Sequence, residues 1–434
     1  MAAGYMFAPA VETMPRDRLA ALQLERLKTT LRHAYGNVAY YKKSFDAAGV
    51  APEDLKGLDD LTRFPFTVKD HLRDFYPFGM FAVPRPEVMR VHASSGTTGK
   101  PSVVGYTHED LEVWADLMAR TMACAGARPG DIVHNAYGYG LFTGGLGAHC
   151  GGERLGCTVV PVSGGFTERQ ITLLQDLGAR VLCATPSYAL NIAEVASRAG
   201  VDLQGGPLAI GIFGAEPWSE ALRAELDQRL GIQAVDIYGL SEIIGPGVAA
   251  ECVEARSGLH VWEDCFLIEV IDPETGEPVA VGEAGELVIS TLAKQAQPMI
   301  RYRTGDVTRL GDEACPCGRT HRRLLRITGR TDDMLIIRGV NLYPSQVEAV
   351  LIGRPDIEPH YQLVVRRDGA MDALTVEVEA QSGVPADRYA EIAGDVEHQV
   401  KARLGVGCRA AVLEPGQVPR SEGKAVRVRD LRSE

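Results

Sequence analysis

Five short apolar runs between residues 131 and 239 constrain the fold of this chain more than any other feature. They are "DIVHNAY", "CTVVPV", "ARVLCATP", "LAIGIFGA" and "AVDIYG", and helical stretches such as "SEALRAELDQRLG" separate them. Apolar runs that alternate with helical segments are typical of βα units, whose strands lie parallel in one sheet. We therefore predict an α/β fold with a mainly parallel sheet.

The segments on either side of this alternation have other patterns. Leu24, Leu27, Leu31 and Tyr35 recur at helical spacing, which predicts an amphipathic helix over residues 16–35. Residues 265–310 carry apolar runs separated by Gly and Pro turns, which indicates an antiparallel element attached to the core. A large N-terminal domain over residues 1–331 accounts for all of these features.

The remaining residues, 332–434, have a size that suits a small C-terminal domain. The runs "YQLVVRR" and "ALTVEVEA" predict two strands on either side of the turn "DGAMD". Residues 387–404 predict a helix after them. The pattern of this domain is therefore α+β.

Charge and composition exclude several classes of protein. A net charge of -12 disfavours a nucleic-acid partner. The N-terminus does not resemble a signal peptide, and no apolar run has the roughly 18 residues of a membrane span. Nine cysteines without an export signal favour reduced thiols or a metal site over disulfides. We expect a cytoplasmic protein that has no membrane partner.

The stretch "ASSGTTGKPSVVGYT" precedes a predicted helix for which Thr107 is a candidate N-cap. It is not a Walker A loop, because position 94 is Ser and position 101 is Pro. It is not a dinucleotide fingerprint either, since "GYGLFT" lacks the third Gly. Its glycines and hydroxyls nevertheless suit phosphate, with a plain surface loop as the alternative.

Seven motifs carry a family resemblance: "SSGTTGKP", "YGYGLFTGGLGAH", "IFGAEPW", "DIYGLSE", "MIRYRTGD", "GRTDDMLIIRGVNLYP" and "SEGKAVRV". Together and in this order they resemble the phenylacetate-CoA ligase family of the adenylate-forming enzymes. The resemblance implies a large adenylation domain and a small mobile domain. It also implies two half-reactions, in which an aromatic acid and ATP form an acyl adenylate and pyrophosphate, and CoA then displaces AMP.

The resemblance assigns the phosphate end of the site. The loop of Ser94, Ser95, Gly96, Thr97, Thr98, Gly99 and Lys100 would hold the β- and γ-phosphates. Ser241 would donate to the α-phosphate, and Glu242 would hold Mg²⁺, which prefers oxygen ligands. The loop then grips a pyrophosphate leaving group.

The nucleoside end follows from other motifs of the resemblance. The adenine would be framed by Asp236, Tyr238 and the turn of Gly214, Ala215, Glu216 and Pro217. The alternative is that Asp236 and Tyr238 form a strand end facing solvent. Asp306 would accept both ribose hydroxyls, and Arg330 would reach phosphate or ribose. Gly305 stands where many members of the family have Arg, although Gly is common in the wider superfamily.

The resemblance also implies roles for residues of the small domain and its boundary. Lys424 is the expected adenylation lysine, a cation that bridges the substrate carboxylate and the α-phosphate. A solvated surface lysine is the alternative. Asp332 is the expected hinge, with a helix cap as its alternative, and the pantetheine path would be lined by Gly339, Val340 and Asn341.

Aromatics and glycines in "YGYGLFTGG" suit a flat apolar slot for a ring, although such a cluster is also common in plain cores. By similarity the slot would contain Tyr137, Phe142, Ala215, Ile237 and Pro246. Five neighbours depart from the family: Cys150, Gly152, Phe166, Cys265 and Gln297. Phenylacetate is the first acid to expect, with benzoate and its hydroxy and amino derivatives as alternatives. A carrier-protein thiol or an amine is the alternative acceptor, and a regulatory nucleotide-binding protein is the alternative class.

Four residues form a candidate structural zinc site: Cys252, His260, Cys315 and Cys317. The Cys-x-Cys spacing is unusual, and His321 competes with His260 for the fourth position. Reduced buried thiols are the alternative. The resemblance further implies a homodimer.

Overall fold

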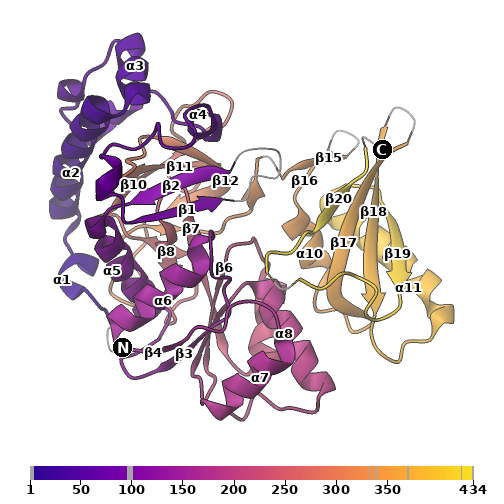
Figure 1. The fold of residues 1–434 in the computed structure, drawn as a ribbon. Coiled ribbons are helices and arrows are strands. Elements are labelled where there is room, and N and C mark those ends of the chain that lie inside the picture. Colours follow the sequence, from indigo (N-terminus) through magenta and orange to yellow (C-terminus); the bar gives the residue numbers. More distant parts are fainter. Residues whose placement is uncertain are drawn as a thin grey trace.

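The alternation of apolar runs and helices forms the parallel half of a 12-stranded sheet (Figure 1). The computed structural model describes residues 4–94, 101–331, 333–337, 340–368, 371–421 and 423–432. Within the sheet the parallel strands are, in spatial order, β4 (Thr158–Val160), β3 (Ile132–Asn135), β5 (Val181–Ala184), β6 (Ile210–Gly214) and β7 (Gln233–Leu240). This confirms the predicted α/β fold class.

The predicted antiparallel element continues the same sheet beyond β7. Its strands follow in the order β8 (Gly245–Glu251), β9 (Leu259–Val261), β13 (Arg323–Leu324), β12 (Tyr302–Gly311), β11 (Ala284–Thr291) and β10 (Phe266–Ile271). A short strand, β14 (Gly329–Arg330), pairs with β12 and sets Asp306 opposite Arg330. The sheet is therefore mixed, and β7 is the strand at which its direction changes.

The helices of the large domain bury apolar faces spaced at helical intervals. Helix α2 (Arg16–Asn37) buries Leu19, Leu27 and Leu31, where the sequence predicted a helix. In α5 (His108–Cys124), Thr107 is the N-cap: its Oγ1 accepts from Asp110 N at 3.1 Å. The other helices are α1 (Pro9–Glu12), α3 (Ala39–Ala48), α4 (Lys69–Asp74), α6 (Thr143–Leu155), α7 (Thr167–Asp176), α8 (Pro186–Arg198) and α9 (Glu220–Leu230), with 3-10 turns at η1 (Pro52–Asp54), η2 (Leu58–Arg63) and η3 (Arg85–Glu87).

The Gly-rich stretch connects the two strands of a separate antiparallel hairpin. Strand β1 (Arg90–Ser94) pairs with β2 (Ser102–Tyr106), and Ser94 lies opposite Ser102 at the end where the connection between the strands begins. The predicted phosphate loop residues Ser95, Gly96, Thr97, Thr98, Gly99 and Lys100 lie outside the described residues.

The C-terminal part forms a second folded unit with its own core, drawn from orange to yellow in Figure 1. A four-stranded sheet has the order β19 (Arg409–Leu413), β18 (Met371–Ala380), β17 (Ile357–Asp368) and β20 (Val428–Asp430). The hairpin of β15 (Leu335–Ile337) and β16 (Val340–Leu342) precedes it, and the remaining elements are α10 (Pro344–Leu351), η4 (Ala386–Arg388) and α11 (Tyr389–Leu404). The proposed boundary at residue 332 stays a prediction, because Asp332 lies outside the described residues.

Two further observations concern membrane-spanning helices and the state of the cysteines. Within the described part of the chain, none of the helices combines the length and the apolar character needed to span a membrane. All nine cysteines are free thiols.

Candidate functional site

The candidate residues gather where the parallel strands end. Tyr137 follows β3, Thr185 follows β5, Ala215 follows β6, and Ser241 follows β7. The carboxyl ends of neighbouring parallel strands lie at one edge of a sheet, and ligands of open α/β sheets bind there. The fold therefore brings motifs separated by about a hundred residues to one edge.

Glu242 lies buried at the centre of this edge, 5% exposed. Ser94 Oγ, at the end of β1, donates to Glu242 Oε1 at 3.3 Å. Next to it, Ser241 Oγ lies 3.2 Å from Thr143 Oγ1, at the start of α6. A carboxylate and three hydroxyls from three chain segments converge here, which is a donor set that suits a hard cation and phosphate oxygens.

Lys69 joins this cluster, although the sequence did not reveal it. Its Nζ lies 3.5 Å from Glu242 Oε1, and the side chain is 38% exposed. Lys69 opens α4, which packs against β2 of the hairpin. In the sequence "FTVKDHLRD" it is indistinguishable from a surface lysine, so only the fold reveals it.

Tyr238 and Arg330 both bind the Asp306 carboxylate. The Tyr238 hydroxyl donates to its Oδ2, and Arg330 Nη1 donates to its Oδ1 at 3.0 Å. Tyr238 thus binds Asp306 through its hydroxyl, and β14 supplies the arginine. Each oxygen of the carboxylate thus accepts a hydrogen bond that helps to orient it.

Gly305 makes the approach of Arg330 possible. Its φ of +77° is in the left-handed region, and a Cβ there would lie 3.2 Å from Arg330 Nη2. Its carbonyl accepts from Thr331 N at 2.7 Å. Gly305, which stands where many members of the family have Arg, therefore lies in close contact with Arg330.

Asp236 lies half-buried on β7 beside a second carboxylate. Its backbone N–H donates to Glu251 Oε2 at 2.9 Å, and Glu251 also pairs with Arg223. Burial raises the pKa of Asp236 to about 7, and the Glu251 charge adds to the shift. A cavity of about 340 Å³ adjoins Asp236 and Glu251.

The expected acid slot contains both buried and exposed residues. Tyr137 is buried and donates to Ile212 O at 3.1 Å, and Ile237 is buried on β7. Gly147 and Gly239 leave room around Pro246: a Cβ at either position would come within 2.7 Å of it. Phe142 and Phe166 face outwards, 54% and 81% exposed. Ala215 is exposed in the turn after β6, with a φ of +74°.

The loop that carries Lys424 lies against the large domain. Thr185 Oγ1 donates to Gly423 O at 2.9 Å, which fixes the residue before Lys424 at the end of β5. The Lys424 side chain is exposed. Of the residues expected at the hinge and the pantetheine path, Val340 and Asn341 lie in β16, whereas Asp332 and Gly339 are outside the described residues.

A buried ion network joins the two domains beside this loop. Glu194 of α8 accepts from His360 Nε2 of β17 and from Arg420 Nε, the latter at 3.0 Å. Arg420 also pairs with Glu379 of the small domain at 2.8 Å. Burial raises the pKa of Glu194, but the hydrogen bonds from His360 and Arg420 and the Arg420 charge outweigh it, so the pKa is lowered. This junction is not predicted by the sequence, because each of its residues is a single charged side chain outside any recognisable motif.

The four candidate zinc ligands come together. Cys252, His260, Cys315 and Cys317 are buried, with their ligand atoms all within 4.8 Å of one another. Cys252 Sγ lies 3.5 Å from Cys315 Sγ, and Cys317 Sγ lies 3.4 Å from His260 Nε2. A tetrahedron with Zn–S near 2.3 Å has edges of roughly 3.5–3.8 Å, so the cluster has the size that zinc needs.

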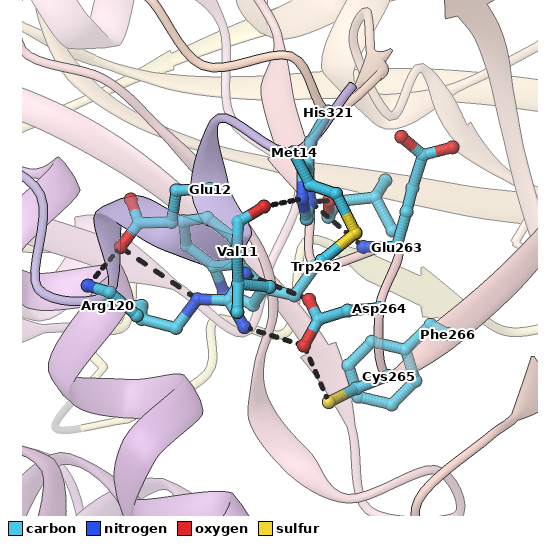
Figure 2. A network of polar contacts seen from close by, with 12 residues as sticks. Val11, Glu12, Met14, Arg120, Trp262, Glu263, Asp264, Cys265, Phe266 and His321 are labelled. Atoms are coloured by element: carbon cyan, nitrogen blue, oxygen red, sulfur yellow. Dashed lines mark hydrogen bonds and ion pairs between the residues drawn. The ribbon is translucent and has the colours of Figure 1, made fainter. Parts of the chain in front are cut away.

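His321 is engaged elsewhere, as Figure 2 shows. Its Nε2 lies 3.0 Å from Val11 O, and its Nδ1 accepts from Glu263 N at 3.1 Å. His260, by contrast, directs Nδ1 to the His321 carbonyl at 3.2 Å and keeps Nε2 toward the sulfurs. The structure therefore brings His260, and not His321, into the cysteine cluster.

A buried charge network lies beside His321 (Figure 2). Arg120 of α5 makes a two-pronged contact with Asp264, at 3.1 and 2.9 Å, and lies over the Trp262 ring. Glu12 pairs with Arg319, two residues after Cys317. Burial raises the pKa of Asp264, but Arg120 outweighs it and the pKa is lowered. The N-terminal segment is thus tied to the antiparallel half of the sheet.

Comparison with known proteins covers both domains. Residues 83–293 match the family described as AMP-binding enzyme, and residues 339–432 match the AMP-binding enzyme C-terminal domain. The phenylacetate-coenzyme A ligase of Thermus thermophilus is 55% identical, over 98% of this chain and 100% of the relative. The phenylacetate-coenzyme A ligase of Aromatoleum evansii is 56% identical, over 97% of this chain and 96% of the relative.

Solved structures of one ligase distinguish two domain arrangements. The 2-hydroxyisobutyryl-CoA ligase in the postadenylation state, with 2-HIB-AMP, is 32% identical, covers 97% of this chain and 91% of its own, and has a TM-score of 0.93. In the thioesterification state, with 2-HIB-AMP and CoA, the same ligase is again 32% identical. The match covers 98% of this chain and 92% of the ligase chain, but the TM-score is 0.74. Since sequence and coverage are nearly the same, the difference lies in how the domains are arranged. The small domain of this chain is placed as in the postadenylation structure.

Proposed function

This chain belongs to the phenylacetate-coenzyme A ligase family, and on that premise we propose that it converts phenylacetate, ATP and CoA into phenylacetyl-CoA, AMP and pyrophosphate. Its class, an adenylate-forming CoA ligase, is that of the family. The observation that carries the proposal is the single edge at which Glu242, Asp306 and the Lys424 loop meet. These are the three groups that a bound adenylate requires at its phosphate, its ribose and its acyl end.

In the first half-reaction a carboxylate oxygen of the acid attacks the α-phosphorus of ATP. The bond from the α-phosphorus to the bridging oxygen breaks, and pyrophosphate leaves. We assign Asp306 to the ribose hydroxyls, Asp236 and Tyr238 to the adenine side, and Ser241 to the α-phosphate. Arg330 orients Asp306 through its 3.0 Å hydrogen bond. Lys424 would neutralise charge between the acid and the phosphate.

Mg²⁺ belongs to this proposal as the ion bound by Glu242. The carboxylate and the Ser94 hydroxyl, 3.3 Å apart, are oxygen donors of the kind it prefers. When bound, the ion would neutralise phosphate charge. Ser95 to Lys100 are proposed to hold the β- and γ-phosphates from the adjoining hairpin connection.

In the second half-reaction the small domain rotates, with Asp332 proposed as the hinge. The CoA thiolate attacks the acyl carbon, the bond from that carbon to the phosphate oxygen breaks, and AMP leaves. Gly339, Val340 and Asn341 are proposed to line the pantetheine path. Val340 and Asn341 are partly or fully exposed on β16, which leaves them accessible to a ligand.

For the acid itself we propose that Tyr137, Ile237 and Pro246 form the inner wall of the slot, with Ala215 and Phe142 at its mouth. The exposed fraction of Phe142, 54%, suits a residue at an entrance. A buried and mainly apolar wall favours an unsubstituted ring over a hydroxy or amino derivative.

Zinc is proposed as a structural ion at Cys252, His260, Cys315 and Cys317. The sulfur–sulfur distance of 3.5 Å and the sulfur–nitrogen distance of 3.4 Å support this ligand set. With four protein ligands the ion would have no open position, so it would hold β9 and the segment after β12 together rather than act in the reaction.

We further propose that the enzyme acts in the cytoplasm, as a homodimer. Nine free thiols suit a reducing compartment. Light scattering on the purified protein tests the dimer, since a monomeric mass would contradict it.

The decisive test of function is thioester formation with ATP, Mg²⁺ and CoA, with pyrophosphate and AMP followed separately. The acids to compare are phenylacetate, benzoate and their hydroxy and amino derivatives. We expect AMP and phenylacetyl-CoA to form fastest with phenylacetate. Pyrophosphate release without a thioester would contradict the proposal and point to a carrier-protein thiol or an amine as acceptor. A clear preference for another acid would replace phenylacetate but keep the ligase.

A further inference from the structure

The side chain of Glu216 bridges the two domains. Its Oε1 accepts from the backbone N–H and the hydroxyl of Ser187, the former at 2.8 Å, at the start of α8. Its Oε2 accepts from Ala425 N at 2.7 Å, across the domain boundary. One carboxylate therefore joins the large domain to the residue that follows Lys424.

The two peptide groups on either side of the Lys424 Cα are both bound to the large domain. The Gly423 carbonyl belongs to the preceding peptide group and accepts from Thr185 Oγ1 at 2.9 Å. The Ala425 N–H belongs to the following one and donates to Glu216. Fixing both groups fixes the backbone dihedrals of Lys424, and with them the direction in which its exposed side chain leaves the chain.

We propose that Glu216 is a positioning residue for adenylation: it holds the Lys424 loop over the strand ends during the first half-reaction only. The inference rests on the proposed function, in which Lys424 serves that step. The bond to Ala425 belongs to one arrangement of the domains, which matches the postadenylation structure at a TM-score of 0.93 against 0.74 for the thioesterification state. Rotation of the small domain removes it.

The chemistry of the contact requires a carboxylate. Glu216 accepts from three donors, and bonds from N–H groups to a charged oxygen are stronger than those to a neutral one. In Glu216→Gln one oxygen becomes an NH₂ group, which would face an N–H donor on one side or the other. The substitution keeps the volume and the backbone turn that is expected to frame adenine.

The test compares the half-reactions in Glu216→Gln. We expect the single-turnover rate of pyrophosphate release to fall about tenfold or more. The rate of thioester formation from supplied phenylacetyl adenylate and CoA should stay unchanged, and so should the KM for ATP. Glu168→Gln, the same substitution at an exposed position on α7, is the matched control and should keep both rates.

A double-variant comparison tests whether the effect passes through Lys424. In a Lys424→Ala background, measured by pyrophosphate exchange, Glu216→Gln should cause no further loss. Equal loss of both half-reactions would overturn the inference and indicate a general structural role. A raised KM for ATP with an unchanged rate would also overturn it, in favour of a direct adenine contact. The wild-type rate tests the proposed function separately, because the inference can fail while the wild type forms adenylate.

Discussion

The ammonium of Lys69 lies 3.5 Å from Oε1 of Glu242, the carboxylate proposed to bind Mg²⁺. The two residues come from α4 and from the turn after β7, so the pair exists only in the folded chain. A cation already stands where another is expected to bind. With the ion on the carboxylate, we expect the Lys69 ammonium to lie beside the phosphate chain and to offset negative charge there.

Lys69→Met is therefore expected to lower the rate of pyrophosphate release about tenfold, which corresponds to about 1.4 kcal/mol. The reason is the loss of a positive charge next to the leaving group. Rapid-quench measurement of the first turnover checks this, with Lys42→Met on the exposed face of α3 as control. An adenylation rate equal to that of the wild type would refute a phosphate role for Lys69.

Lys424→Ala is expected to reduce adenylate formation by at least about 100-fold, because the charge between acid and α-phosphate is lost. Thioester formation from supplied acyl adenylate should remain, since that step does not use the lysine. The control is Lys401→Ala, an exposed lysine on α11 of the same domain. Comparable loss in both half-reactions would show that Lys424 has another role.

The affinity for ATP should depend on pH through Asp236. Burial raises the pKa of this carboxyl to about 7, and Glu251 adds to the shift. The ionised form accepts the adenine amino group more strongly, so the KM for ATP should fall as the pH rises from about 6 to about 8. Initial rates of pyrophosphate release at saturating acid measure this.

Asp236→Asn supplies the control for that profile, because the amide does not titrate and the dependence should flatten. The same shift has a cost in stability. The folded state binds this proton more tightly than the unfolded chain does, so the free energy of unfolding should decrease as the pH rises from about 4 to about 7. An unaltered KM profile in Asp236→Asn would assign the dependence to another group.

Purified protein is expected to carry one zinc ion per chain, measurable by elemental analysis. Cys317→Ser should lose the ion and unfold at a lower temperature, whereas Cys408→Ser, in the small domain, should retain it. A ligand held at about 1,000 times its Kd stabilises the folded state by about 4 kcal/mol, which sets the scale of the loss. Metal-free protein with unchanged thermal stability would favour reduced buried thiols.

Local patterns predicted most of the elements but not all of their pairings. The βα alternation correctly indicated β3 to β7, and helical spacing indicated α2. Neither pattern could reveal that β9 pairs with β13, because His260 and Arg323 lie far apart in the chain. This pairing joins the parallel and antiparallel halves into one sheet. Strand pairing over such distances depends on packing of the whole domain, which no short window contains.

The site divides in the same way. Motifs predicted Glu242, Asp306 and Lys424 as site residues, because each stands in a distinctive run of residues. Lys69, Glu194 and the bridging role of Glu216 were missed or only partly seen, since a lone charged side chain in a helix or turn looks the same whether it faces solvent or another domain. Their partners come from distant segments, and the fold alone brings them together.

The junction at Glu194 sets two properties of the enzyme against each other. This carboxylate stays on α8 while His360 and Arg420 arrive with the small domain, so every catalytic cycle that rotates this domain must break the contact and form it again. A stronger junction would keep the domains associated on heating but would delay their separation, and a weaker one would do the reverse. Adaptation of this ligase to a hotter or colder habitat can therefore act at one buried carboxylate, where resistance to heat is exchanged for speed.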